Sequence, residues 1–267
     1  MIDERTSRPR RSGRRRRRAG ELLLQVSGPI LLLAIWELLS RTERIDPRFW
    51  PAPTSLLSTL RRLIESGQLA TDVRASLLRI LVGFVVAAIP GVFFGLAMGL
   101  YRPVRLFLMP IAPAIYAVPK IAVLPLMLVI FGAGESSKVA IIVISVFFLI
   151  ALSTMGGVLA IDPIFGDVAR DFDASQWQIV RTVALPGALP AIFTGLRLAL
   201  GFSLLIIVGA EFLDAADGDG LGALIYRSYQ NFALEQLFVG LIVVGLLGWV
   251  LSVGLDLVER LVVPWQP

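Results

Sequence analysis

The residue types that most often carry out catalysis are scarce in this chain of 267 residues, which contains no Cys and no His. Their absence excludes a Cys/His zinc site, a disulfide framework, a Cys-His nucleophile pair and a Ser-His-Asp triad. Lys occurs only at Lys120 and Lys138, and neither follows a Gly, so the sequence lacks the Gly-Lys-Ser/Thr of a phosphate-binding Walker A loop. Asp and Glu do not cluster at metal-ligand spacing. We therefore expect no enzymatic activity, no metal and no cofactor.

Lys120 is a candidate for contact with a ligand, because it stands in an otherwise apolar block, residues 106–134. That block also contains Pro110, Pro113, Pro119 and Pro125. Proline kinks helices, and a helix broken this often is tolerated in a membrane only where protein or a water-filled cavity satisfies the freed carbonyls. A cation at membrane depth is a functional candidate by default. Two roles stay open for Lys120: lining a pathway together with Pro119, or pairing structurally with a carboxylate.

Arg197 and Glu211 are the other charged candidates for such a pathway, and both lie in one apolar block. They are fourteen residues apart, which is close to four helical turns. They should therefore share a helix face without touching each other. Structural pairing with other helices is the favoured role for both.

The elements that must position these residues are six long apolar blocks. The chain is 56% hydrophobic and 17% charged, against about 25% charged in soluble domains. A membrane span needs about 20 apolar residues. We predict an all-α polytopic membrane domain over 21–267, with six transmembrane helices at about 22–40, 78–101, 106–132, 138–161, 188–212 and 236–258. A Gly91, Gly95, Gly99 stripe in the second span should pack against a helix of the same chain.

The orientation follows from the charge of the N-terminal tail. Residues 1–20 carry nine Arg and two acidic residues, a net charge of +7, while the remainder carries −2. We interpret the tail as a disordered cytoplasmic anchor that contacts anionic membrane lipid. A nucleic-acid arm is disfavoured, because no aromatic residue interrupts the Arg run. Six spans then place both termini in the cytoplasm.

Residues 41–74 disagree with this orientation, because the segment would lie outside and yet has six Arg against four acidic residues. Partial pairing of these charges is the explanation that we expect. Within the segment, Thr54 could cap a helix in which Leu56, Leu60 and Leu63 recur at helical spacing. That helix could lie on the membrane surface or pack on a neighbouring helix.

Residues 162–186 form the longest predicted cytoplasmic loop. Pro163 to Phe172 has helical character, and Asp173 to Gln176 reads as a capping box that opens a second short helix through Trp177. Apolar side chains on the two helices, Val168, Phe172, Trp177 and Val180, would suit docking into a groove on a soluble partner. The alternative is a re-entrant cap folded on its own bundle.

Several short stretches resemble the EAA loop of ABC-importer permeases: Asp167-Val168-Ala169, Asp173-Ala174-Ser175-Gln176-Trp177, Leu185-Pro186 and Gly195-Leu196-Arg197. Others look like the nitrate/sulfonate/taurine branch: Trp50-Pro51-Ala52-Pro53, Ala75-Ser76-Leu77-Leu78-Arg79, Val118-Pro119-Lys120, Phe131-Gly132-Ala133-Gly134-Glu135 and Gly220-Leu221-Gly222. Two departures stand out. Asp167 replaces the family's Glu, and Asp173 replaces a Gly that permits a left-handed turn. Either the turn is rebuilt as a plain N-cap, or coupling is tuned or impaired.

This resemblance implies a type I importer permease in the bacterial cytoplasmic (inner) membrane. It implies two permease copies in a complex, cytoplasmic ATP-binding subunits, an extracytoplasmic solute-binding protein and a small solute, anionic or not, such as a sulfonate, nitrate or taurine. It also assigns ATPase coupling to Asp167, Val168, Ala169, Phe172, Asp173, Ala174, Ser175, Trp177, Leu185 and Pro186. Pro119-Lys120 differs from the Pro-Pro often seen in sulfonate permeases.

A secondary transporter driven by an ion gradient is the alternative from another class. It would use paired intramembrane acids or unwound helices, commonly in repeated halves. The acidic residues in the apolar blocks, Glu37, Glu211 and Asp256, all stand near span ends.

Overall fold

The computed structural model describes residues 27–213, 216 and 218–265, with backbone alone at 113 and 116. All regular elements in this part of the chain are helices. They divide into two compact units, residues 1–61 and 62–267, which are described separately. The Arg-rich tail lies outside the described residues.

In the first unit, a helix over 27–41 contains the end of the first predicted span. Glu37, the one charge of that block, pairs with Arg41 and accepts hydrogen bonds from the Thr54 backbone N–H at 3.0 Å and from its hydroxyl at 2.8 Å. The predicted cap at Thr54 is wrong, because helix α2 (Pro53–Glu65) begins one residue earlier and the polar groups of Thr54 bind Glu37 instead.

Ion pairs partly neutralise the positive charge of residues 41–74, which is the explanation expected from the sequence. Arg48 donates to Asp46 at 2.9 Å, and these bonds hold the pKa of the Asp46 carboxyl below its usual value. In the second unit, Arg62 contacts Glu235 at 3.5 Å.

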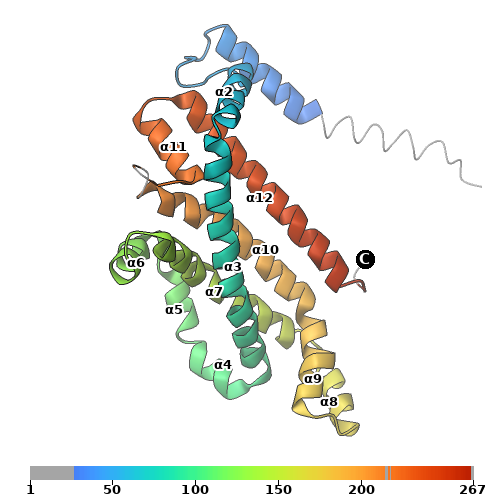
Figure 1. Cartoon of the computed structure of the whole chain (residues 1–267). Helices are drawn as coiled ribbons and strands as arrows, with labels where there is room; N and C mark the ends of the chain where they lie inside the picture. Colours follow the sequence, from blue (N-terminus) through green and yellow to red (C-terminus); the bar gives the residue numbers. More distant parts are fainter. Residues whose placement is uncertain (1–26, 214–215, 217, 266–267) are drawn as a thin grey trace, which may run out of the picture. The chain divides into compact units, whose positions relative to one another are not determined.

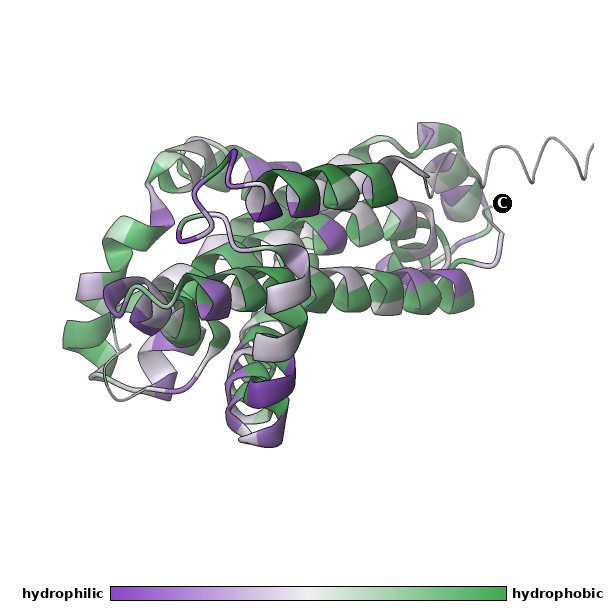
Figure 2. Cartoon of the chain, turned by 90° about the horizontal axis from the view of Figure 1, so that it is seen from above, coloured by the Kyte–Doolittle hydropathy of each residue, from purple (hydrophilic) through white to green (hydrophobic). Residues whose placement is uncertain are grey.

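The second unit contains four helical stretches long and apolar enough to cross a membrane, among the residues described. They are α3 (Gln68–Leu100), α7 (Glu135–Leu159), a continuous stretch that ends with α10 (Leu185–Phe212), and α12 (Leu234–Val262) (Figure 1). Figure 2 shows that most of the helical ribbon is hydrophobic, with hydrophilic residues in short patches. The helices extend beyond the predicted spans, since α3 begins at Gln68 rather than 78.

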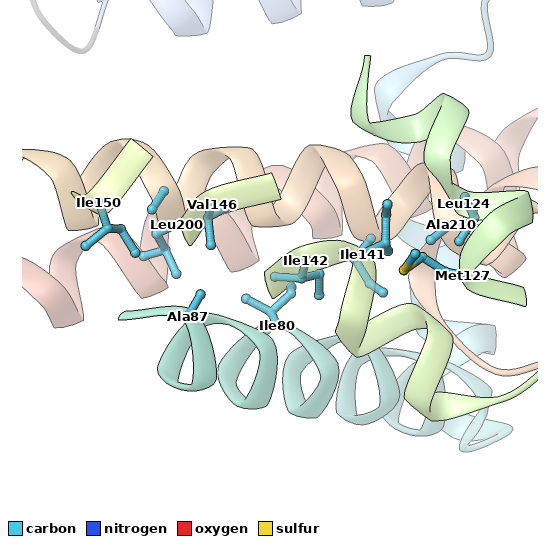
Figure 3. Close-up of a cluster of buried hydrophobic side chains, with 12 residues drawn as sticks. Ile80, Ala87, Leu124, Met127, Ile141, Ile142, Val146, Ile150, Leu200 and Ala210 are labelled. Atoms are coloured by element: carbon cyan, nitrogen blue, oxygen red, sulfur yellow. The ribbon is translucent and has the colours of Figure 1, made fainter. Parts of the chain in front are cut away.

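The core of this unit lies where α3, α7 and α10 meet (Figure 3). Ile80 from α3, Ile142 from α7 and Ile207 from α10 are completely buried there. The glycine stripe brings two of these helices together. A Cβ atom at Gly95 would lie 2.5 Å from the Ala151 carbonyl oxygen on α7, and one at Gly99 would lie 2.5 Å from Val158 Cβ. The prediction of packing within the chain is confirmed.

The third predicted span, 106–132, is not one helix. It comprises α4 (Arg102–Leu108), α5 (Ala112–Ala117), a 3-10 turn η1 (Lys120–Val123) and α6 (Leu124–Phe131). Its prolines lack backbone donors, and Pro113, Pro119 and Pro125 stand at the starts of the short helices, where a missing donor is tolerated. The expected breaks are therefore present, but a continuous span is absent. Between α10 and α12 lies a further short helix, α11 (Leu221–Gln230).

Candidate functional site

The segment 162–186 forms two short helices that lie at the N-terminal end of α10 (Figure 1). Helix α8 (Pro163–Asp171) begins at Asp162, whose carboxylate accepts the Ile164 N–H at 2.9 Å. Helix α9 (Gln176–Ile179) continues directly into a π-helical turn, η2 (Val180–Ala184), and then into α10. The predicted pair of helices is confirmed.

The turn between α8 and α9 is left-handed at Asp173, with φ 54°. The Asp173 N–H donates to the Arg170 carbonyl at 2.9 Å, and the Ala174 N–H donates to the Ala169 carbonyl at 3.0 Å. These two bonds form the Schellman motif that ends many helices, usually with Gly at the left-handed position. The predicted N-cap at Asp173 is therefore wrong, because this residue terminates α8 and keeps the backbone conformation that the family's Gly favours.

The capping box of α9 lies two residues further along than predicted. The Ser175 hydroxyl accepts the Gln178 N–H at 3.3 Å, and the Gln178 side chain accepts the Ser175 N–H at 2.7 Å. Both Asp173 to Gln176 and Ser175 to Gln178 fit the sequence rule. The left-handed turn at Asp173 excludes the first of these in the folded chain.

An exposed apolar surface covers α8 and α9, and we call it the knob surface: Phe165, Val168, Phe172 and Trp177. The exposed fractions of Phe172 and Trp177 are 83% and 70%. Sequence reasoning missed Phe165, which is 60% exposed in the first turn of α8. Asp167 pairs with Arg170 on the same helix at 2.6 Å, and both side chains are exposed. The segment therefore presents aromatic and aliphatic side chains beside one ion pair of its own, Asp167 with Arg170.

Arg197 links α10 to α12. Its guanidinium donates to Asp256 at 2.7 Å and to Glu259 at 2.5 Å, and these two carboxylates stand three residues apart on α12. The pairing with another helix that the sequence predicts is present. The i,i+3 spacing of Asp256 and Glu259 is the signal that could have identified the partners.

Glu211 belongs to a network that is buried apart from the exposed Glu135, and we call it the Arg79 network: Asp72, Ser76, Arg79, Glu135 and Glu211. Glu211 accepts from Arg79 at 2.7 Å, from the Ser76 hydroxyl at 2.8 Å and from the Gly222 N–H at 2.8 Å. Arg79 also donates to Glu135 at 2.5 Å. The network joins α3, α7, α10 and the start of α11.

The glycines at the start of α11 permit this network. Gly220 has φ 135°, and a Cβ atom there would lie 2.3 Å from the Glu211 carboxyl carbon. Its N–H donates to Asp72 at 2.8 Å. Sequence reasoning did not single out Arg79 as a partner, although Asp72, Ser76 and Arg79 are spaced four and three residues apart and thus share one helix face.

Lys120 bonds to the carbonyls of the broken third span. Its ammonium donates to the Val118 oxygen at 2.8 Å and to the Ile115 oxygen. Beside it lies a cavity of about 260 Å³, lined by residues 117–120 and by Ser145, Leu149, Phe202 and Ile206. Pro119 and Lys120 thus line one cavity, whereas Arg197 and Glu211 are held in ion pairs elsewhere on α10. In the part of the chain that is described, no three acidic residues lie close enough together to hold a metal ion.

Comparisons with known proteins agree with this geometry. A family model described as binding-protein-dependent transport system inner membrane component matches residues 91–266. The Escherichia coli taurine transport system permease protein TauC is 33% identical over 92% of this chain and 90% of its own. The Synechocystis nitrate import permease protein NrtB is 31% identical over 88% and 86%, respectively.

A solved structure shares the fold. A chain of the MetNI methionine ABC transporter, in an inward-facing conformation, matches with a TM-score of 0.62 and 22% identity, over 72% of this chain and 94% of that chain. The polytopic helical fold expected from the sequence is confirmed by this likeness.

Proposed function

Because the chain belongs to the family of binding-protein-dependent transport system inner membrane components, it is a membrane-embedded permease subunit of an ABC importer, and we propose that its segment 162–186 is the part that docks on the ATPase. The ATPase is a separate subunit in such systems, which also use a solute-binding protein. The observation that carries the proposal is the knob surface on α8 and α9.

The knob surface has the composition of a docking element. Exposed aromatic side chains are the commonest anchors of protein interfaces, and Phe172 and Trp177 supply two on adjacent short helices. Residues Ala169, Ala174 and Ser175 shape the turn that presents them. Closure of the ATPase dimer on ATP would draw two such segments together and switch the pathway between inward- and outward-facing states.

We further propose that Pro119 and Lys120 line the pathway of a small anionic solute. The support is the cavity beside the Lys120 ammonium and the break in the third span that opens it. The named relatives act on taurine and nitrate, which is consistent with a cationic contact. Arg197 and Glu211 hold the helices around the pathway together, since each forms an ion pair with a residue on another helix.

The topology and assembly complete the proposal. Both termini and segment 162–186 lie in the cytoplasm, two copies of the permease face each other, and the Arg tail contacts anionic lipid. This arrangement rests on the tail charge and on the even number of predicted spans.

An ion-gradient-driven transporter is not supported by the acidic residues. Glu37, Glu211 and Asp256 are paired with Arg41, Arg79 and Arg197, respectively. Each of these three carboxylates already has a cationic partner in place of a coupling ion.

The deciding experiment removes the aromatic anchors. In the double variant Phe172→Ala/Trp177→Ala, we expect the ATPase to bind at least tenfold more weakly, because truncation of such anchors commonly costs about 2 kcal/mol or more. Trp249→Ala is the matched control, since Trp249 is 65% exposed on α12, away from the knob surface. The measurement is ATPase binding to the purified permease in detergent. Unchanged binding in the double variant would show that the docking element lies elsewhere.

A further inference from the structure

The π-helical turn η2 (Val180–Ala184) lies between the proposed docking helix α9 and the membrane helix α10, and the three form one continuous helical stretch. The Leu185 N–H donates to the Val180 carbonyl, five residues back. An α-helix makes this bond to the fourth residue back, so the turn accommodates one additional residue. Such turns are rare and often occur at functional sites.

The additional residue aligns the buried face of the helix. Ile179, Ala184, Ala188 and Ile192 are all buried, at spacings of five, four and four residues. In an uninterrupted α-helix, five residues turn the chain by about 500°, which would leave Ile179 about 140° away from Ala184 around the axis. The π-helical turn therefore sets the direction in which α9 presents Trp177.

Local residues explain why the α-helical register is not enforced here. Pro186 has no N–H to donate to Thr182, and its ring would collide with that carbonyl in a regular α-helix. The Thr182 hydroxyl donates to the Gln178 carbonyl at 2.7 Å, a bond that bends helices.

The helix beyond this turn is fixed to its neighbour α7. A Cβ atom at Gly157 on α7 would lie 2.6 Å from Ala191 Cβ and 3.1 Å from the Ala188 carbonyl oxygen on α10, and one at Gly195 on α10 would lie 2.5 Å from Ser153 Cβ on α7. Helices in such close contact over about two turns move together. A displacement of α9 must therefore be absorbed before Ala188, where η2 lies.

We propose that η2 is a hinge that switches between π- and α-helical register when the ATPase opens and closes, so that α9 rotates relative to α10. Loss of the additional residue turns α9 by about 100°, which moves a side chain at a helix radius of about 5 Å by roughly 8 Å. The inference rests on the proposed ATPase docking and adds to it: the docking helix pivots on the bundle and does not move as a rigid extension of α10.

The absence of Cys from the sequence makes the test direct. Nitroxide labels on Leu159→Cys and Gln176→Cys report the position of α9 relative to α7, and labels on Leu159→Cys and Leu198→Cys report α10 relative to α7. Leu159, Gln176 and Leu198 are all exposed. Distances are measured by pulsed electron resonance in the complete complex, with one labelled permease copy, before and after trapping of ATP on the ATPase.

We expect the 159–176 distance to shift by several ångström on nucleotide trapping and the 159–198 distance to stay constant. Deletion of Thr182 removes the additional residue and should abolish the shift, whereas Thr182→Ala keeps the chain length and should retain it. An unchanged 159–176 distance in a complex that has trapped nucleotide would overturn the hinge. Failure of the ATPase to bind the unlabelled permease would instead contradict the docking proposal, so the two failures are distinguishable.

Discussion

The carboxylate of Glu211, near the end of α10, accepts a hydrogen bond of 2.7 Å from the Arg79 guanidinium on α3, and both side chains are buried. Two residues 132 positions apart in sequence thus form an ion pair inside the bundle. Glu211 also accepts hydrogen bonds from the Ser76 hydroxyl and the Gly222 N–H, so its removal would leave several buried donors without their acceptor.

This pair gives the first prediction. We expect Glu211→Ala to lower the free energy of unfolding in detergent by about 1–3 kcal/mol, because the Ser76 hydroxyl and the Gly222 N–H lose their buried acceptor while Arg79 keeps only Glu135 as an acidic partner. Arg48→Ala is the control: Arg48 also belongs to an ion pair, but its side chain is 85% exposed, and exposed pairs contribute about 0–1 kcal/mol. Equal stability of the two variants would contradict the role of the Arg79 network.

The glycine stripe of α3 gives the second prediction. Gly95→Ala should destabilise the protein by about 1–3 kcal/mol, because the new methyl group would lie 2.5 Å from the Ala151 carbonyl oxygen and must separate α3 from α7. Gly245→Ala meets nothing within 4 Å on α12 and should leave stability unchanged or raise it. Thermal unfolding of both purified variants measures the difference, and a neutral Gly95→Ala would argue against the tight helix contact.

The left-handed residue Asp173 gives the third prediction. Asp173→Gly should retain coupling and raise stability by up to about 1 kcal/mol, because Gly adopts this conformation without a steric penalty. Asp173→Val should impair coupling, since a β-branched side chain is strongly disfavoured there. The readout is ATPase activity stimulated by the binding protein in reconstituted vesicles. Loss of stimulation in Asp173→Gly would show that the carboxylate itself is required.

Lys120 gives the fourth prediction. If the ammonium contacts an anionic solute, Lys120→Met should reduce uptake at least tenfold while the complex still assembles. If its bonds to the carbonyls of Ile115 and Val118 matter more, the variant should instead lose assembled protein. Uptake into vesicles and size-exclusion chromatography are measured on the same preparation. Normal uptake by the variant would exclude the pathway role.

Topology gives the fifth prediction. A single Cys at Asp171, in α8, should resist an impermeant maleimide added to intact cells, because the proposed orientation places the segment 162–186 in the cytoplasm. A single span, α10, lies between the segment 162–186 and α11. A single Cys at Gln230, at the end of α11, should therefore react from outside. Labelling at Asp171 and protection at Gln230 would reverse the proposed orientation.

Local sequence alone predicted the apolar helices and the presence of breaks in the third span. A hydrophobic block needs no distant partner to favour the membrane, and four prolines in one block favour a broken helix. The positions of the breaks were not determined locally, since α3 and α10 continue through Pro90 and Pro190. The close packing at the glycine stripe could also be predicted, because its four-residue spacing places three small residues on one helix face. The two short helices of 162–186 followed from their own polar and apolar pattern.

Tertiary structure decided which charges meet and which cap is used. Arg79 and Glu211 pair across α3 and α10, and Arg197 binds two carboxylates on α12, because helix packing brings together residues that are distant in sequence. At Asp173 and Ser175 the same capping rule fits two overlapping positions, and the left-handed end of α8 selects the second. The π-helical turn depends on the alignment of Ile179 with Ala184 on one buried face, which short-range periodicity does not encode.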